Sequence, residues 1–216
     1  MRTLAILPVK RLEQAKQRLS ASLGPERRRE LATAMLSDVL ATLTDCEQIE
    51  STLVVTSDAE AAACAGRHGA QIIEDADEDG QSAAANQGIQ RALDTGYERV
   101  LLVPGDCPAL DADELIQLLD TPGAPPSVTI VPDRHNAGTN ALLLAPPNAL
   151  VPAFGEGSLA RHCERATSSG ADWQVLELKS LAYDVDTPAD LRALCRLLAK
   201  REGTAPRTRA LLIDEP

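Results

Sequence analysis

The chain has 216 residues, of which 44% are hydrophobic and 25% are charged, and its formal net charge is −11 at pH 7. This composition is typical of a globular protein with one sizeable core, and the negative charge argues against binding to nucleic acid or to an anionic membrane. Aromatic residues make up only 2% of the chain, which excludes base-stacking platforms and predicts a core of Leu, Val, Ile and Ala.

The five cysteines are widely spaced and include no C-x-x-C pair. An odd number without such a pair indicates reduced, packed thiols, so we expect a cytoplasmic protein. The apolar run near the N-terminus is interrupted at Lys10 and Arg11, which makes it too short for a signal peptide. No run approaches the roughly 18 apolar residues of a membrane span.

Short apolar runs alternate with helical stretches along most of the chain. Strands are expected at residues 4–7, 53–56, 71–73, 100–103, 128–131 and 140–144. A helix is expected to open at Pro25, and others near residues 58–66, 83–95 and 111–119. This alternation predicts an α/β fold with three layers (α/β/α) and a mostly parallel sheet.

Two further helices are expected toward the C-terminus. One begins at Ser158, and the other begins at Thr187 and Pro188, where Asp190 completes a capping box. The last helix is expected to end at about Lys200, which closes a single domain spanning residues 1–200. The tail 201–216 is rich in Arg, Pro and Thr, and we expect it to be disordered or to add an edge strand at 210–213.

Ligands of open parallel sheets bind at the carboxyl ends of the strands, so the residues that follow each strand are candidates for the site. A cationic loop follows the first strand, where a phosphate could bind, and its charged residues are Lys10, Arg11, Lys16 and Arg18. The loop has no Walker motif, and the alternative interpretation is a solvated loop with salt bridges.

Carboxylates follow two other segments. Asp106 comes directly after the strand at 100–103, where it could hold Mg²⁺ while ligand phosphates complete the coordination; the alternative is a turn residue. Asp184 and Asp186 are two residues apart, so on an extended segment they share a face and their repulsion favours a cation between them. Asp186 could instead only support the following helix cap.

Small and hydroxyl residues mark two further loops, 133–140 and 154–158. Gly155 and Gly157 precede a helix and leave backbone N–H groups open to an anion, while Thr139 and Ser158 add hydroxyl groups. These features predict a phosphate-bearing small substrate, and the alternative is a loop without a ligand. The histidines have no metal-ligand spacing and are expected to be structural or solvent-facing, with His162 as the one site candidate.

Taken in order over about residues 3–200, these segments resemble the 2-phospholactate/phosphoenolpyruvate guanylyltransferase family of deazaflavin coenzyme (F-420) biosynthesis, a branch of the GT-A-like nucleotidyltransferases. The resemblance is carried by the following motifs: Pro8-Val9-Lys10, Ala15-Lys16-x-Arg18-Leu19, Met35-Leu36-x-Asp38-Val39-Leu40, Pro104-Gly105-Asp106-x-Pro108-Ala109-Leu110, Asp133-Arg134, Gly138-Thr139-Asn140-Ala141-Leu142, Phe154-Gly155-x-Gly157-Ser158 and Asp184-Val185-Asp186-Thr187-Pro188-x-Asp190-Leu191. It implies a nucleotide-diphospho-sugar transferase fold.

The activity that the resemblance implies is transfer of GMP from GTP, the co-substrate, to the phosphate of a small acid, with release of pyrophosphate. Phosphoenolpyruvate, 2-phospho-L-lactate and 3-phospho-D-glycerate all remain open as acceptors, because Asn136-Ala137 and Glu156 depart from the family pattern. The resemblance also implies a homodimer and a hand-off of the product to a downstream transferase.

The resemblance also implies roles for individual residues. Mg²⁺ would be bound by Asp106, Asp184 and Asp186, and the acceptor phosphate would be held by Lys10, Thr139, Gly155 and Ser158. Lys16 and the segment from Ser82 to Asn86 would face the nucleotide, and Lys10 and Asp106 would be catalytic. The alternatives are another GT-A-type nucleotidyltransferase or glycosyltransferase, and a catalytically silent nucleotide-binding module.

Overall fold

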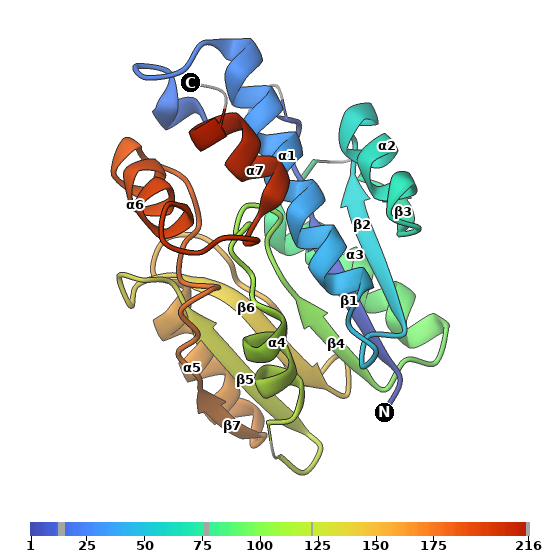
Figure 1. Ribbon diagram of the computed structural model, residues 1–216. Helices are drawn as coiled ribbons and strands as arrows, with labels where there is room; N and C mark the ends of the chain where they lie inside the picture. Colours follow the sequence, from blue (N-terminus) through green and yellow to red (C-terminus); the bar gives the residue numbers. More distant parts are fainter. Residues whose placement is uncertain (13–15, 76–77, 122, 215–216) are drawn as a thin grey trace.

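The computed structural model describes residues 1–12, 16–75, 78–121 and 123–214, whose strands form one seven-stranded sheet (Figure 1). The strands are β1 (Thr3–Pro8), β2 (Ser51–Thr56), β3 (Gln71–Glu74), β4 (Arg99–Leu102), β5 (Ser127–Pro132), β6 (Thr139–Ala145) and β7 (Asp172–Val175). Their order across the sheet is β3-β2-β1-β4-β6-β5-β7. Only β6 runs antiparallel to its neighbours among these strands, so the predicted mostly parallel sheet is confirmed.

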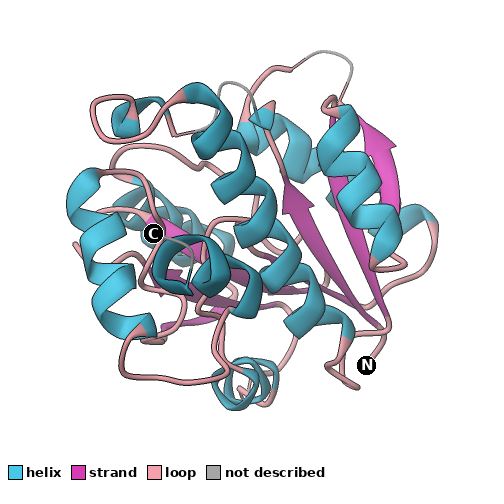
Figure 2. Cartoon of the chain, turned by 45° about the horizontal axis from the view of Figure 1, so that its top comes forward, coloured by secondary structure: helices cyan, strands magenta, loops and turns pink. Residues whose placement is uncertain are grey.

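Helices cover both faces of the sheet, as Figure 2 shows. They are α1 (Pro25–Thr44), α2 (Ala59–Arg67), α3 (Gln81–Asp94), α4 (Ala112–Leu119), α5 (Ser158–Ser169), α6 (Pro188–Leu198) and α7 (Pro206–Arg209), with a 3₁₀ turn η2 (Gln17–Leu19) and a π-helical turn η3 (Ala210–Asp214). The predicted capping box of α6 is present. None of the described helices combines the length and apolar character needed to cross a membrane.

Alternation along β1 divides the core between the two faces of the sheet. Ala5 and Leu7 pack in the layer that holds α1, α2 and α4, whereas Leu4 and Ile6 pack in the layer that holds α3 and α5. Helix α3 comes very close to β1, because a Cβ atom built on Gly88 would lie 2.4 Å from Cγ2 of Ile6. The absence of a side chain at residue 88 therefore sets the distance between α3 and the sheet.

The residues after α6 pack against α1. The carboxylate of Asp38 accepts hydrogen bonds from the backbone N–H groups of Arg207, at 3.1 Å, and Thr208, at 2.8 Å. The predicted edge strand at 210–213 is wrong, because this segment forms η3 and its Leu212 and Ile213 pack into a cluster with α1 and α6. Residues 215–216 of the predicted tail lie outside the described residues.

Strand β7 was not among the strands predicted from the sequence. It has only four residues, and its Asp172 and Gln174 interrupt the apolar pattern on which a strand prediction depends. Its extended form comes from parallel pairing with β5, in which Ser127 lies opposite Asp172. Such pairing is a tertiary contact that the local sequence does not encode.

The topology brings several predicted residues to one edge of the sheet. Strands β1 and β4 are parallel and end at this edge, where Lys10 and Asp106 follow them. Strand β6 is antiparallel to β4, so it begins at the same edge, and Thr139 is its first residue. The reversal of β6 is what adds Thr139 to residues that follow the ends of parallel strands.

Candidate active site

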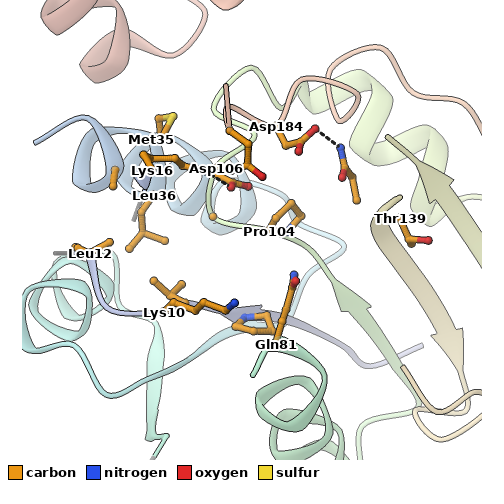
Figure 3. A pocket seen from close by; sticks show the side chains of 16 residues that line it. Lys10, Leu12, Lys16, Met35, Leu36, Gln81, Pro104, Asp106, Thr139 and Asp184 are labelled. Atoms are coloured by element: carbon orange, nitrogen blue, oxygen red, sulfur yellow. Dashed lines mark hydrogen bonds and ion pairs between the residues drawn. The ribbon is translucent and has the colours of Figure 1, made fainter. Parts of the chain in front are cut away.

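A pocket of about 470 Å³ lies at this edge of the sheet (Figure 3). The predicted site residues that line it are Lys10, Lys16, Asp106, Thr139, Asp184 and Asp186. In Figure 3, Lys10 and Gln81 lie across the pocket from Lys16 and Asp106. The fold thus gathers six side chains from four separate segments of the chain around one cavity.

Lys16 connects two of the three acidic residues. Its Nζ lies 2.9 Å from Oδ1 of Asp186 and also forms an ion pair with Asp106, and its side chain is only 6% exposed. Burial disfavours the ammonium, but the two carboxylates outweigh burial and raise the pKa of Lys16 above its ordinary value. Lys16 is therefore charged at neutral pH. Ala15, which precedes it in the loop motif, lies outside the described residues.

Asp184 is the third carboxylate of the pocket. Its Oδ1 accepts a hydrogen bond from Nδ2 of Asn140 at 3.2 Å, and the same Nδ2 donates to the carbonyl of Leu181 at 2.7 Å. Burial and the negative charge of Asp106 raise the pKa of Asp184 to about 6, although the bond from Asn140 opposes this rise. A carboxylate with such a pKa lies in a place where a bound cation would be stabilising.

The donor chemistry of the pocket fits Mg²⁺, because Asp106, Asp184 and Asp186 all offer carboxylate oxygens, the ligands that this ion prefers. Within the described residues, no group of three or more His, Cys, Asp or Glu side chains stands ready to hold a metal ion. The ammonium of Lys16 instead contacts Asp106 and Asp186. A metal ion at these two carboxylates would thus have to take the place of Lys16.

The start of α6 holds the segment that carries Asp186. Oδ2 of Asp190 accepts hydrogen bonds from the backbone N–H groups of Asp186, at 3.2 Å, and Thr187, at 2.6 Å. The other oxygen of Asp190 forms an ion pair with Arg134, which follows β5. The helix cap is thus made by Thr187 and Asp190, while the carboxylate of Asp186 faces Lys16.

Three of the four predicted phosphate-binding residues, Thr139, Gly155 and Ser158, form a connected group at the pocket, whereas no hydrogen bond among the described residues joins Lys10 to them. Oγ of Ser158 accepts a hydrogen bond from the backbone N–H of Thr139 at 2.8 Å, and Oγ1 of Thr139 lies 2.8 Å from Nδ1 of His162. Gly155 precedes α5 with a φ of 109°, in the region that favours glycine. The backbone N–H of Ser158 donates to the carbonyl of Gly155 at 3.0 Å, and neither of these two residues lines the pocket.

The residues predicted to face the nucleotide divide into two groups. Lys16 lines the pocket, whereas Ser82 and Asn86, both on α3, do not. Oγ of Ser82 accepts a hydrogen bond from the backbone N–H of Phe154 at 2.9 Å, so it connects α3 to the loop before α5, and Asn86 is exposed.

Two polar lining residues, Gln81 and Asn140, were not predicted as site residues from the sequence. Gln81 is the first residue of α3 and lines both the main pocket and a second one of about 210 Å³, which continues toward Asp75 and Glu78. Asn140 follows Thr139 at the start of β6, and its side chain lies between Leu181 and Asp184. Position at a helix start or strand start was the available signal for both residues.

Comparisons with known sequences agree with the motifs described above. The family model described as guanylyl transferase CofC like matches residues 3–207. A phosphoenolpyruvate guanylyltransferase from Conexibacter woesei is 45% identical over 213 residues, which cover 98% of this chain and 96% of the relative. A phosphoenolpyruvate guanylyltransferase from Sphaerobacter thermophilus is 40% identical over 200 residues, or 90% of this chain and 93% of the relative.

Comparisons with solved structures point to the same fold. A candidate nucleotide-diphospho-sugar transferase from Desulfovibrio desulfuricans has a TM-score of 0.76 at 18% identity, and the match covers 99% of this chain and 95% of that one. A nucleotidyl transferase from Methanothermobacter has a TM-score of 0.68 at 16% identity, covering 93% of this chain and 99% of that one. The predicted fold of the nucleotide-diphospho-sugar transferase type is therefore confirmed.

Proposed function

Because the chain belongs to the CofC-like guanylyl transferase family and is a nucleotidyltransferase, we propose that it transfers GMP from GTP to the phosphate of phosphoenolpyruvate. The observation that carries the proposal is the convergence of three carboxylates, two lysines and Thr139 on one pocket. The choice of acceptor follows the names of the relatives from Conexibacter woesei and Sphaerobacter thermophilus. The product would pass to a downstream transferase in the assembly of the deazaflavin coenzyme.

The reaction needs alignment and charge neutralisation rather than a general base. An oxygen of the acceptor phosphate, largely a dianion near neutral pH, attacks the α-phosphorus of GTP and forms the new P–O–P bond. The bond between the α-phosphorus and the oxygen that bridges to the β-phosphate breaks, and pyrophosphate leaves with the electron pair. No proton has to move, which is consistent with a pocket lined by lysines and carboxylates.

Each side chain has a role in this scheme that suits its charge. Lys10 and the Thr139 hydroxyl hold the acceptor phosphate, with Ser158 and the loop at Gly155 supporting Thr139 from behind. Once the ammonium of Lys16 has moved away from Asp106 and Asp186, it neutralises negative charge on the triphosphate of GTP. Asp106, Asp184 and Asp186 would hold Mg²⁺, which when bound would supply positive charge to the phosphates of GTP.

The experiment is to measure pyrophosphate release and product mass with Mg²⁺ for GTP, ATP, CTP and UTP. Each nucleotide is combined with phosphoenolpyruvate, 2-phospho-L-lactate and 3-phospho-D-glycerate. We expect release with GTP and phosphoenolpyruvate and a product containing guanosine diphosphate linked to the acid. Pyrophosphate release only with another acid would identify that acid as the acceptor in place of phosphoenolpyruvate. No pyrophosphate release by the folded protein in any combination would contradict guanylyl transfer.

Asp106→Asn tests the metal assignment within the same assay. We expect kcat to fall at least ~100-fold, because the variant removes a charged ligand of the ion that neutralises the phosphates. Asp113→Asn, at an exposed position in the first turn of α4, is the matched control and should retain activity. Near-normal turnover of Asp106→Asn would show that Asp106 does not hold the metal.

A further inference from the structure

A chain of hydrogen bonds runs from the loop before α5 through a buried histidine to the pocket. The backbone N–H of Ala153 lies 2.8 Å from Nε2 of His162, and Nδ1 of the same ring lies 2.8 Å from Oγ1 of Thr139. His162 is completely buried, and its ring packs edge-on against Phe154 at 5.3 Å between centroids. Both ring nitrogens therefore have one defined partner each.

The partners determine which nitrogen of His162 carries the proton. The Ala153 N–H can only donate, so Nε2 must present its lone pair. Burial, together with the charges of Arg165 and Arg161, lowers the pKa of His162 to about 4, so the ring carries a single proton at neutral pH. That proton is on Nδ1, which donates to Oγ1 of Thr139. A ring turned over by 180° would place C–H groups against both partners.

The direction of this bond determines what Thr139 can offer to the pocket. Because its Oγ1 accepts from the imidazole, the single hydroxyl proton of Thr139 has to point away from His162. The backbone N–H of Thr139 donates to Oγ of Ser158 at 2.8 Å, which holds the residue from a second side. Thr139 is one of the residues that line the pocket, so the hydroxyl proton that turns away from His162 can be donated to a ligand there.

We propose that His162 is a positioning residue that, through its Nδ1–H, makes the Thr139 hydroxyl a fixed donor to an oxyanion of the acid acceptor. The inference rests on the proposed function, since it takes the acceptor to be a phosphorylated acid. Phosphate and carboxylate oxygens offer only lone pairs near neutral pH, so a hydroxyl held as a donor is matched to them. His162 itself does not line the pocket and acts only through Thr139.

Two substitutions of His162 separate its two hydrogen bonds. His162→Asn places an amide nitrogen near the position of Nδ1 and keeps a donor to Thr139, while the acceptor for Ala153 is lost. His162→Gln places an amide oxygen near the position of Nε2 and keeps the acceptor for Ala153, while the donor to Thr139 is lost. Both variants alter the same buried site, and their melting temperatures report what each loses in packing, so each serves as the other's control.

Steady-state kinetics and calorimetric titration with phosphoenolpyruvate are the readouts. We expect His162→Gln to raise the KM and the Kd for phosphoenolpyruvate ~10-fold or more, the effect of losing an oriented hydrogen bond to a charged group. The KM for GTP should stay unchanged, and His162→Asn should keep most of the affinity for phosphoenolpyruvate. Equal losses in the two variants, in proportion to their melting temperatures, would assign His162 a structural role only and overturn the proposal.

A double-mutant cycle tests whether His162 acts through Thr139. Thr139→Val alone should weaken phosphoenolpyruvate binding about as much as His162→Gln, and the double variant should be no weaker than either single variant. Effects that multiply in the double variant would overturn the proposal, because they would mean that His162 reaches the acceptor by another route.

The tautomer of His162 can be read without turnover. In ¹⁵N-labelled protein at pH 7, we expect one of the three histidines to have a protonated Nδ1 and a bare Nε2, and this signal should disappear in His162→Gln. A proton on Nε2, or a charged ring, would overturn the proposal. This readout also separates the proposed guanylyl transfer from the positioning role of His162. Absence of guanylyl transfer in every combination of substrates would contradict the proposed function, and the tautomer and the calorimetric titration would still decide the role of His162.

Discussion

Replacing Lys16 with Met would leave Asp106 and Asp186 without the ammonium that now contacts both of them. The lysine side chain is 6% exposed, whereas those of Asp106 and Asp186 are 30% and 50% exposed. Loss of one partner from a fully buried pair costs about 3–5 kcal/mol, but solvent screens these two acids, so we expect a loss of about 2 kcal/mol in the free energy of unfolding. For a domain of this size, that loss lowers the melting temperature by about 4–8 °C.

The assay is thermal unfolding in EDTA and in millimolar Mg²⁺. In the wild-type protein, Mg²⁺ competes with Lys16 for Asp106 and Asp186, and in the Lys16→Met variant it does not. We therefore expect Mg²⁺ to raise the melting temperature of the variant by more than that of the wild type, because tighter binding to the folded state gives greater stabilisation.

Lys10→Met is the matched control, since Lys10 is an exposed lysine that lines the same pocket. Its melting temperature in EDTA should change little, as is usual for substitutions at exposed positions. If Mg²⁺ raised the melting temperatures of the wild type and of Lys16→Met equally, the metal and the lysine would not share these carboxylates. That result would refute the reasoning.

Three further predictions concern stability, measured by urea unfolding. Asp38→Ala removes the buried carboxylate that accepts from two backbone N–H groups of the tail, and it should lower the free energy of unfolding by about 3 kcal/mol. A decrease below about 1 kcal/mol would mean that these two hydrogen bonds do not hold the tail in place. Gly88→Ala brings a Cβ to 2.4 Å from Ile6, so we expect a net destabilisation, because overpacking costs about 1–3 kcal/mol and helix propensity returns only about 1 kcal/mol. Gly66→Ala is the control, since its Cβ would meet open space and the substitution should stabilise the protein. A stabilised Gly88→Ala variant would contradict the packing argument. The pKa of His162, about 4 in the folded state, lies below the ordinary value of 6.5, so the unfolded chain binds a proton first as the pH falls. The free energy of unfolding should then decrease by about 3 kcal/mol from pH 7 to pH 4 relative to His162→Gln, and a pH-independent difference would show that the imidazole is not held neutral.

The local pattern of the sequence was sufficient for most of the secondary structure. Apolar runs predicted six of the described strands, and the capping box at Thr187 and Asp190 predicted the start of α6. Short-range physics determines these features, because burial of alternate side chains and capping of a helix need only neighbouring residues. Strand β7 and turn η3 escaped this reasoning, since each depends on packing against a distant element.

The same division applies to the pocket. That Lys10 and Asp106 belong to one site was predictable because they follow parallel strands, and the ends of parallel strands share an edge of the sheet. Lys16 was assigned to the nucleotide, yet it contacts Asp106 and Asp186, which are 90 and 170 positions away in the chain. No local pattern indicates that contact.

The sequence by itself therefore determined the α/β class, the family and the residue types at one edge of the sheet. The tertiary structure alone decided that β6 reverses and brings Thr139 to that edge, and that His162 stands behind Thr139 with its Nδ1 toward the hydroxyl. The physical reason is range: propensity, capping and alternation act between neighbours, whereas ion pairs and oriented hydrogen bonds join side chains that only the folded backbone brings within 3 Å.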